Sequence, residues 1–134
     1  MTEGSRLKVL IVDDDEIQLT VLRGWLEHDG YEVCTRNSAF GTSSTVLREH
    51  PDIVILDLEM PGLNGDAVAK LLGSLSGGKK IGIVFYSGND VPNLQELARE
   101  ARVLGAIRKT HQSELFREQF SRLVGRVAPR RQEG

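Results

Sequence analysis

Short, mainly apolar runs recur along the chain, separated by longer segments in which apolar residues return every three or four positions. The runs cover residues 8–12, 31–35, 53–56, 81–86 and 103–107. Runs this short, bounded by acids, glycine or proline, are typical of strands, and the unbroken run at 53–56 is typical of a strand covered on both faces. We therefore predict five strands, of which 31–35 is less buried because its apolar and polar residues alternate.

The intervening segments have helical spacing, so each strand is predicted to be followed by a helix. Asp15 and Glu16 suit the start of the first helix, which ends near residue 29. A second helix is expected over 38–49, Pro92 fits the first turn of the fourth, and Ser113 is expected to cap the fifth. The apolar faces of the last three helices are Val68, Leu71, Leu72 and Leu75; Leu94, Leu97, Ala98 and Ala101; and Phe116, Phe120, Leu123 and Val127.

A strand and a helix alternating five times predict an α/β fold, a three-layer sandwich in which helices cover both faces of a parallel sheet. The 134 residues, 40% apolar and 27% charged, are enough for one folded domain. We place this domain at residues 6–127 and expect 128–134 to be a tail or linker. Two interpretations stay open: a stand-alone domain, or one piece of a longer protein.

Net charge, cysteine content and the length of the apolar runs indicate which partners and which cellular compartment to expect. A net charge of −2 and a pI near 5.9 give no general field for nucleic acid or anionic lipid, so we expect protein partners and no direct nucleic-acid binding by this domain. The one cysteine, Cys34, cannot form an internal disulfide and is most simply a small buried strand residue. No apolar run has the length of a signal peptide or a membrane span, so we expect a cytoplasmic protein without a membrane partner.

Acidic, hydroxyl and basic side chains follow four of the predicted strands. Because parallel strands place their carboxyl ends at one edge of the sheet, residues that follow different strands meet there. The residues so placed are Asp13, Asp14 and Asp15 after the first strand, Asp57 after the third, Ser87 after the fourth and Lys109 after the fifth. Each alone has an ordinary interpretation as a helix cap or a strand-end residue. Their convergence at one edge indicates a functional site.

Several carboxylates at one edge require a counter-ion. Two carboxylates about 5 Å apart repel by about 3 kcal/mol at an effective dielectric constant of about 20, so the cluster must hold protons, bind a cation or spread apart. Mg²⁺ prefers such oxygen ligands and keeps waters for phosphate oxygens. With this ion, the Asp57 carboxylate is suited to attack a phosphoryl group and form an acyl phosphate, while Lys109 and Ser87 contact the phosphoryl oxygens.

Four motifs carry a family resemblance. They are Leu-Ile-Val-Asp-Asp-Asp-Glu at 10–16, Val-Ile-Leu-Asp-Leu-Glu-Met-Pro-Gly at 54–62 with Asn-Gly at 64–65, Ile-Val-Phe-Tyr-Ser-Gly at 83–88, and Gly-Ala-Ile-Arg-Lys at 105–109. In this order and spacing, the chain over residues 6–127 resembles the receiver domains of two-component response regulators. The resemblance implies a flavodoxin-like sheet of strand order 2-1-3-4-5 with five helices.

The resemblance also implies a function. A receiver accepts a phosphoryl group from a histidine kinase or phosphotransfer protein of a two-component or phosphorelay system, and it signals to a downstream protein through changed contacts or homodimerisation. It promotes only its own phosphorylation and dephosphorylation and is not otherwise an enzyme. The matching positions assign phosphate acceptance to Asp57, direct Mg²⁺ binding to Asp14, Asp57 and the backbone carbonyl of Glu59, water-mediated Mg²⁺ binding to Asp13, and phosphoryl contacts to Ser87 and Lys109.

Two positions depart from the family pattern. Ala106 stands where receivers commonly have a tyrosine or phenylalanine that rotates on phosphorylation, and Thr110 stands where a proline commonly follows the lysine in a cis peptide. A cis bond to threonine costs about 2.5 to 4 kcal/mol, against about 0.5 to 1 for proline, so we predict a trans bond between Lys109 and Thr110. Both departures concern the output surface, which we expect over residues 92–127, the fourth helix, fifth strand and fifth helix.

Three other classes share parts of this pattern. A flavin carrier of the same architecture needs a phosphate in its first loop, which the acids at 13–15 would repel. A haloacid-dehalogenase-like phosphohydrolase has an Asp-x-Asp motif, whereas residues 57–59 of this chain are Asp-Leu-Glu. Such an enzyme also normally has a cap domain. The stronger alternative is a receiver-like protein-binding module that acts without phosphorylation. Ala106 and Thr110 favour this alternative, and the intact acids, Ser87 and Lys109 oppose it.

Overall fold

The computed structural model describes residues 6–61, 63–64, 67–68, 70, 81–88, 93–125 and 127. Strands and helices alternate along these residues, as the hydrophobic pattern predicts, except that no helix with defined bounds lies between the third and fourth strands. The strands are β1 (Lys8–Val12), β2 (Glu32–Arg36), β3 (Ile53–Asp57), β4 (Gly82–Ser87) and β5 (Gly105–Arg108). The helices are α1 (Glu16–His28), α2 (Thr42–Glu49), α4 (Leu94–Ala101) and α5 (Ser113–Val124).

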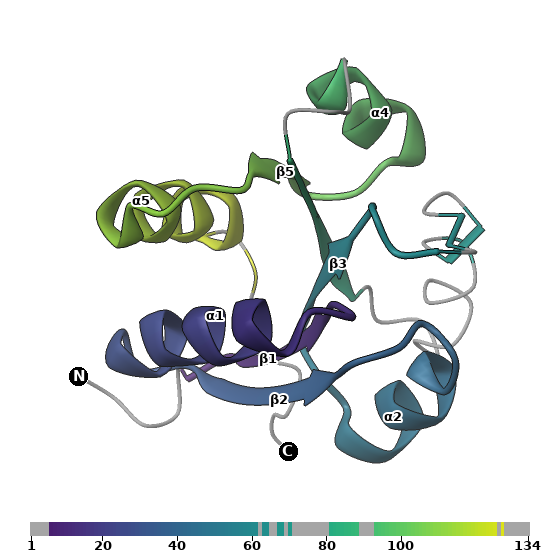
Figure 1. Cartoon of the computed structure of the whole chain (residues 1–134), viewed down its shortest axis with the longest axis horizontal. Helices are drawn as coiled ribbons and strands as arrows, with labels where there is room; N and C mark the ends of the chain where they lie inside the picture. The colour runs from purple at the N-terminus through teal and green to yellow at the C-terminus, as the bar shows by residue number, and fades with distance from the viewer. Residues whose placement is uncertain are drawn as a thin grey trace.

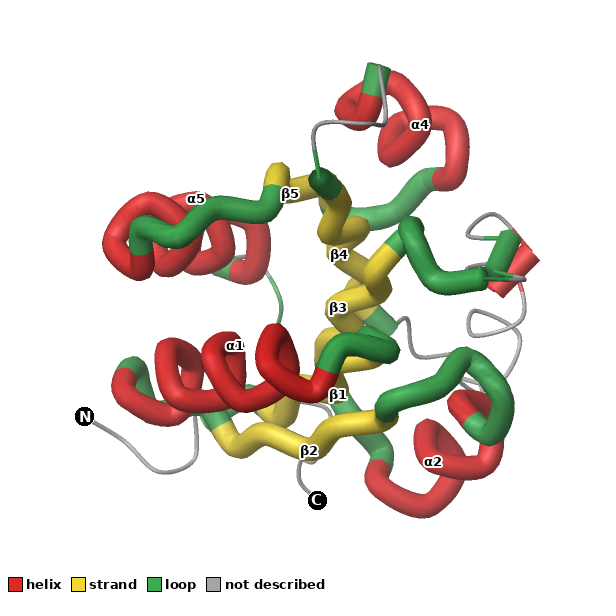
Figure 2. Tube along the Cα trace, viewed as in Figure 1, coloured by secondary structure: helices red, strands yellow, loops and turns green. Residues whose placement is uncertain are grey.

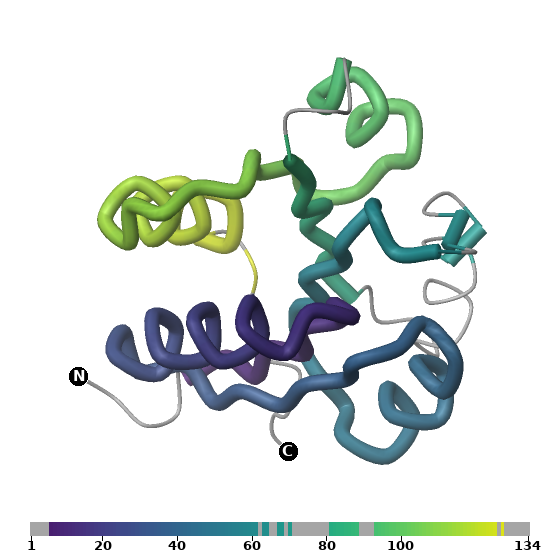
Figure 3. Tube along the Cα trace, in the orientation of Figure 1, coloured from purple at the N-terminus to yellow at the C-terminus, as the bar shows by residue number. Residues whose placement is uncertain are grey.

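The strands form one parallel sheet in the order β2-β1-β3-β4-β5, which confirms the predicted order. Figure 3 follows the chain through this sheet, where after β2 at one edge it crosses back to β3, which lies beside β1. Helices α1 and α5 cover one face of the sheet and α2 and α4 cover the other (Figures 1 and 2). The observed fold is therefore the predicted three-layer α/β sandwich. Within the described residues, no helix is long and apolar enough to cross a membrane.

The sheet has a hydrophobic core on each face because successive strand residues point to opposite sides. On the side of α1 and α5, Ile11 packs in one cluster with Phe116 and Phe120. On the side of α2 and α4, Leu10 packs in a second cluster with Leu94. The central strand β3 contributes to both clusters, and all five of its residues are buried. This is what its unbroken apolar run predicts.

Several element boundaries differ from the predictions. The second helix begins at Thr42 and not at residue 38, because Gly41 has a φ of 87° and a left-handed residue cannot continue a right-handed helix. Ser113 is the first residue of α5, but Gln112 is its N-cap and provides no side-chain hydrogen bond, so the predicted serine cap is wrong. The fifth strand begins at Gly105 and not at residue 103.

The predicted third helix lies largely outside the described residues. Leu71, Leu72 and Leu75 of its expected apolar face fall outside them, whereas Val68 is helical and packs against the core on the side of α2 and α4. Pro92, predicted in the first turn of the fourth helix, also falls outside. The described residues therefore contain four helices with defined bounds where five were predicted.

Candidate functional site

The strand ends bring the predicted site residues to one edge of the sheet. Asp57 and Ser87 are the last residues of β3 and β4, each one position beyond the predicted strand end, and they are 2% and 0% exposed. Asp13 follows β1 and is 1% exposed, and its backbone N–H donates to the Arg36 carbonyl at 3.1 Å. Lys109 follows β5, and its backbone N–H donates to the Ser87 carbonyl at 2.8 Å. Bonds between neighbouring strands thus position three of these end residues.

The three adjacent acids after β1 have different environments. The Asp15 carboxylate caps α1 by accepting the backbone N–H groups of Ile17 and Gln18, at 2.9 and 3.4 Å, which confirms the predicted helix start. The Asp15 N–H donates to Asp13 Oδ1 at 2.9 Å. Asp13 Oδ2 is buried and has no hydrogen-bond partner within the described part of the chain. Asp14 is exposed and free of the helix cap.

Asp13, Asp14 and Asp57 form an acidic cluster in which one oxygen of each lies within 4.8 Å of the others. Burial, together with the nearby charge of Asp57, raises the pKa of Asp13 to about 7, against the lowering effect of the Asp15 N–H and of Lys109. Carboxylate oxygens at this spacing suit Mg²⁺, and a bound cation would also give Asp13 Oδ2, which has no hydrogen-bond partner among the described residues, a direct contact. The residues present therefore fit a magnesium ion.

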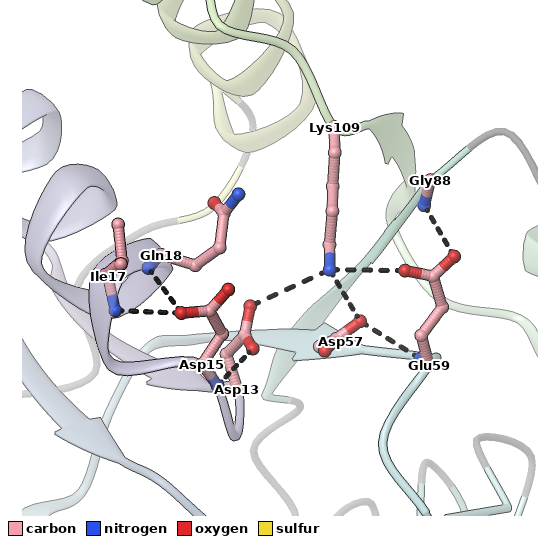
Figure 4. Close-up of polar contacts among 8 residues, drawn as sticks. All are labelled: Asp13, Asp15, Ile17, Gln18, Asp57, Glu59, Gly88 and Lys109. Atoms are coloured by element: carbon pink, nitrogen blue, oxygen red, sulfur yellow. Dashed lines mark hydrogen bonds and ion pairs between the residues drawn. The ribbon is translucent and has the colours of Figure 1, made fainter.

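Lys109 is the cation that the fold brings to these acids (Figure 4). Its Nζ lies 3.2 Å from Asp57 Oδ1, 3.3 Å from Glu59 Oε1 and 4.0 Å from Asp13 Oδ2. Burial alone would lower the pKa of Lys109, but the charges of Asp57 and Asp13 outweigh it and hold that pKa above its ordinary value. No cis peptide bond occurs among the described residues, so the bond between Lys109 and Thr110 is trans, as predicted. The lysine reaches the acids nonetheless.

Ser87 brings a hydroxyl group to the same edge. In the pairing of β3 with β4, Asp57 lies opposite Tyr86, so Ser87 is the next residue along the neighbouring strand. Its Oγ is buried and, among the residues described, has no hydrogen-bond partner. A buried polar group without a partner costs roughly 1 to 3 kcal/mol, so this hydroxyl is poised to bond a ligand.

Two side chains at this site, those of Glu59 and Tyr86, make contacts that were not predicted. The Glu59 carboxylate, where the sequence indicated a role only for the backbone carbonyl, contacts Lys109 Nζ and the backbone N–H of Gly88. The ring of Tyr86 lies 5.7 Å from Lys109 Nζ, a cation–π distance. The position of Glu59, two residues after Asp57, could have indicated a further carboxylate at this edge. Tyr86 gives no such signal because it lies inside an apolar strand.

Comparison with protein families agrees with this fold. The family profile described as the response regulator receiver domain matches residues 9–120. Because the match covers most of the chain, this protein belongs to the response regulator receiver domain family. Proteins of this family are signalling modules of two-component systems.

Two curated relatives match about half of the chain. The alkaline phosphatase synthesis transcriptional regulatory protein PhoP of Bacillus subtilis is 38% identical over 65 residues, which are 48% of this chain and 27% of PhoP. The polar-differentiation response regulator DivK of Brucella ovis is 31% identical over 64 residues, which are 48% of this chain and 52% of DivK. The matches thus span about a quarter and about half of the lengths of these relatives.

Solved structures match nearly the whole chain. A response regulator receiver protein from Burkholderia phymatum has a TM-score of 0.72 and 28% identity, covering 92% of this chain and 99% of that protein. The signal receiver domain of a DNA-binding response regulator from Colwellia psychrerythraea has a TM-score of 0.76 at 20% identity, covering 90% of this chain and 99% of that domain. The second likeness concerns the fold alone.

Proposed function

We propose that this receiver domain is a phosphoacceptor that takes a phosphoryl group on Asp57 in a Mg²⁺-dependent reaction. The observation that carries the proposal is the environment of Asp57. It is a buried carboxylate at the end of the central strand, 3.2 Å from the Lys109 amine and grouped with Asp13 and Asp14. A carboxylate nucleophile flanked by a cation site and hydrogen-bond donors is suited to form an acyl phosphate.

Each of the other residues at the site is proposed either to bind the metal ion or to contact the phosphoryl oxygens. Mg²⁺, when bound, neutralises charge on the oxygens of the group being transferred. The proposed roles are direct Mg²⁺ binding by Asp14, Asp57 and the Glu59 carbonyl, water-mediated binding by Asp13, and donation to the phosphoryl oxygens by Lys109 Nζ and Ser87 Oγ. The Ser87 hydroxyl and Asp13 Oδ2, which have no hydrogen-bond partner in the part of the chain that the structure describes, support these roles.

Transfer forms one bond and breaks one. An oxygen of Asp57 bonds to phosphorus while the bond from phosphorus to the donor breaks, and the donor leaves with that electron pair. The donor we infer is the phosphohistidine of a histidine kinase or phosphotransfer protein. The phosphoryl group carries roughly 1.5 to 2 negative charges, and because the Asp57 carboxylate loses its own charge when the bond forms, the net gain beside Lys109 is roughly 0.5 to 1 negative charge. This added charge changes the contacts that α4, β5 and α5 make with a downstream protein or a second copy of the chain.

The test is incubation with acetyl phosphate, with and without Mg²⁺, followed by intact-mass spectrometry. We expect the wild type to gain one phosphoryl group only with Mg²⁺, and Asp57→Asn to gain none. Asp15→Asn is the matched control, because its carboxylate only caps α1 and asparagine caps a helix equally well. Equal gains by Asp57→Asn and the wild type would refute the proposal. No gain by folded wild type would instead favour the module that acts without phosphorylation.

A further inference from the structure

The carboxylate of Glu59 contacts two hydrogen-bond donors across the site (Figure 4). Its Oε1 lies 3.3 Å from Lys109 Nζ, and its Oε2 accepts the backbone N–H of Gly88 at 3.2 Å. The backbone N–H of Glu59 in turn donates to Asp57 Oδ1 at 3.0 Å. One residue therefore connects the Asp57 carboxylate, the lysine that faces it and the residue that follows Ser87.

The two donors, Lys109 Nζ and the Gly88 N–H, border the space beside Asp57. Lys109 Nζ is within 3.2 Å of Asp57 Oδ1, and Gly88 directly follows the buried end of the neighbouring strand β4. The two oxygens of the Glu59 carboxylate reach both donors at once. A phosphoryl group bonded to Asp57 presents anionic oxygens to the same lysine and the same strand end, and charged oxygens of this kind prefer such donors.

Gly88 is bonded on both sides, and the contact with Glu59 depends on its lack of a side chain. A Cβ added to Gly88 would lie 2.9 Å from Glu59 Oε2, so the flexible carboxylate would have to move away. The Gly88 carbonyl accepts Arg108 Nη1 at 2.6 Å. Gly88 is therefore held by two hydrogen bonds, one from its N–H to Glu59 and one from Arg108 to its carbonyl oxygen.

The charges at this edge make the Glu59 contact sensitive to the state of Asp57. Asp57, Asp13 and Glu59 all lie within 4.0 Å of the single Lys109 amine, which cannot neutralise three carboxylates. A phosphoryl group on Asp57 adds further negative charge at the same place. The Glu59 side chain is 31% exposed whereas those of Asp13 and Asp57 are buried, so Glu59 is the acid that can leave for solvent.

We propose that, in the unphosphorylated protein, the Glu59 carboxylate occupies the position that the phosphoryl oxygens take on phosphorylation. Phosphorylation of Asp57 therefore has to displace this carboxylate from Lys109 and Gly88. This inference rests on the proposed function. Glu59 is thereby a positioning residue that keeps the two donors in place and slows the entry of small anionic phosphodonors. Its displacement changes the bonding of Gly88, so it carries the state of Asp57 to the end of β4 without an aromatic residue at position 106.

The test measures the rate of phosphoryl gain from acetyl phosphate and Mg²⁺. In this reaction the bond between Asp57 and phosphorus forms, and acetate leaves with the electron pair of the broken phosphorus–oxygen bond. Glu59→Gln removes the charge, and Gly88→Ala displaces the carboxylate while keeping the charge. Glu27→Gln makes the same change of net charge at an exposed position near the far end of α1. Rates are compared over a range of acetyl phosphate concentrations, at low and high salt.

The three variants are expected to differ in rate because the Glu59 carboxylate carries a negative charge. Glu59→Gln raises the rate at low acetyl phosphate concentration and low salt by about tenfold, because an anion no longer opposes the incoming dianion. Gly88→Ala raises it by a smaller factor, about threefold, and Glu27→Gln leaves it at the wild-type value. The effect of Glu59→Gln shrinks at high salt because exposed charges are screened.

The outcomes separate this inference from the proposed function. An unchanged rate in Glu59→Gln, with normal phosphoryl gain in the wild type, overturns the inference and leaves the proposed function standing. No gain in any folded variant overturns both. A second readout is the ¹H–¹⁵N NMR resonance of the Gly88 amide, which we expect to move in unphosphorylated Glu59→Ala and, in the wild type, on addition of beryllofluoride and Mg²⁺. A Gly88 resonance that Glu59→Ala leaves in place contradicts the contact itself.

Discussion

The backbone N–H of Lys109 donates a 2.8 Å hydrogen bond to the carbonyl oxygen of Ser87. This bond continues the pairing of β4 with β5, in which Ser87 lies opposite Arg108, by one residue. From this fixed start the lysine side chain reaches Asp57 at 3.2 Å, although the following bond to Thr110 is trans. Strand pairing, and not the turn that follows, therefore places the lysine.

Lys109→Gln is predicted to slow phosphoryl gain at Asp57 by about tenfold or more, because it removes a charged donor that faces the phosphoryl oxygens. Hydrogen bonds to charged groups contribute about 1.5 to 3 kcal/mol, and 1.4 kcal/mol corresponds to a factor of ten. The time course with acetyl phosphate and Mg²⁺ measures the rate. Arg122→Gln is the control, since its guanidinium forms an exposed ion pair on α5 with Glu118. Equal rates in Lys109→Gln and Arg122→Gln would remove Lys109 from the site.

Asp14 and Asp15 are neighbours in sequence but are predicted to differ in Mg²⁺ binding. Asp14 belongs to the acidic cluster with Asp13 and Asp57, whereas the Asp15 carboxylate is bonded to the first turn of α1. Asp14→Asn should weaken Mg²⁺ binding by about tenfold or more, and Asp15→Asn should change it little. Isothermal titration calorimetry with MgCl₂ measures both. Similar losses would mean that the acidic loop is assigned one residue out of register.

Asp13 should make the stability of the magnesium-free domain depend on pH. In the folded state its pKa is raised from 3.8 to about 7, mainly by burial. Between these values the folded chain holds a proton that the unfolded chain has lost, so the free energy of unfolding falls as pH rises from about 4 to about 7. We expect Asp13 to account for a loss of roughly 2 to 4 kcal/mol across this window at most.

Urea unfolding in EDTA at pH 5 and pH 8 measures this effect. Asp13→Asn cannot ionise at this position, so its stability should change less with pH than that of the wild type, and at pH 8 it should be the more stable of the two. Mg²⁺ should restore the wild type at pH 8 because it stabilises the ionised carboxylate. A wild type that gains stability over Asp13→Asn as pH rises in EDTA would contradict the prediction.

Ala106 lies in a closely packed part of the proposed output surface. It is 5% exposed, it packs in one cluster with Leu94 and Ala98 of α4, and its carbonyl accepts the side chain of Gln95 at 3.0 Å. Ala106→Tyr should therefore lower the free energy of unfolding by about 1 to 3 kcal/mol through overpacking and shift α4, while phosphoryl gain at Asp57 stays near the wild-type rate.

Two measurements check the Ala106→Tyr prediction. Urea unfolding gives the loss of stability, and analytical ultracentrifugation of phosphorylated and unphosphorylated protein gives self-association. Ala106→Ser, which adds little volume, is the control. Unchanged stability together with unchanged self-association in both states would argue against α4, β5 and α5 as the output surface.

The edge that carries the site could be predicted because its residues end apolar runs. Asp57 and Ser87 each close such a run, and parallel topology alone brings these strand ends together. The strand order came from the resemblance to a family, since alternation of strands and helices does not determine it. The trans bond after Lys109 followed from the intrinsic cost of a cis bond to threonine.

Other features depend on tertiary structure and left no local pattern. Residues 38–41 were included in the predicted second helix, and it is the left-handed backbone of Gly41 that delays the start of α2 to Thr42. The direction of the Glu59 carboxylate is set by Gly88 and Lys109, which lie 29 and 50 positions further along the chain. Contacts at such separation cannot be inferred from residue spacing within one segment.

Locating the phosphoryl group is the most direct test of the proposed function. Sodium borohydride reduces an aspartyl phosphate, and the changed residue can be found by tandem mass spectrometry of proteolytic peptides after treatment with acetyl phosphate and Mg²⁺. We predict that the change occurs at Asp57, and that it is absent when either acetyl phosphate or Mg²⁺ is omitted. A change at Asp14 or Glu59 with Asp57 unmodified, or phosphate retained on Ser87, would contradict Asp57 as the phosphoacceptor.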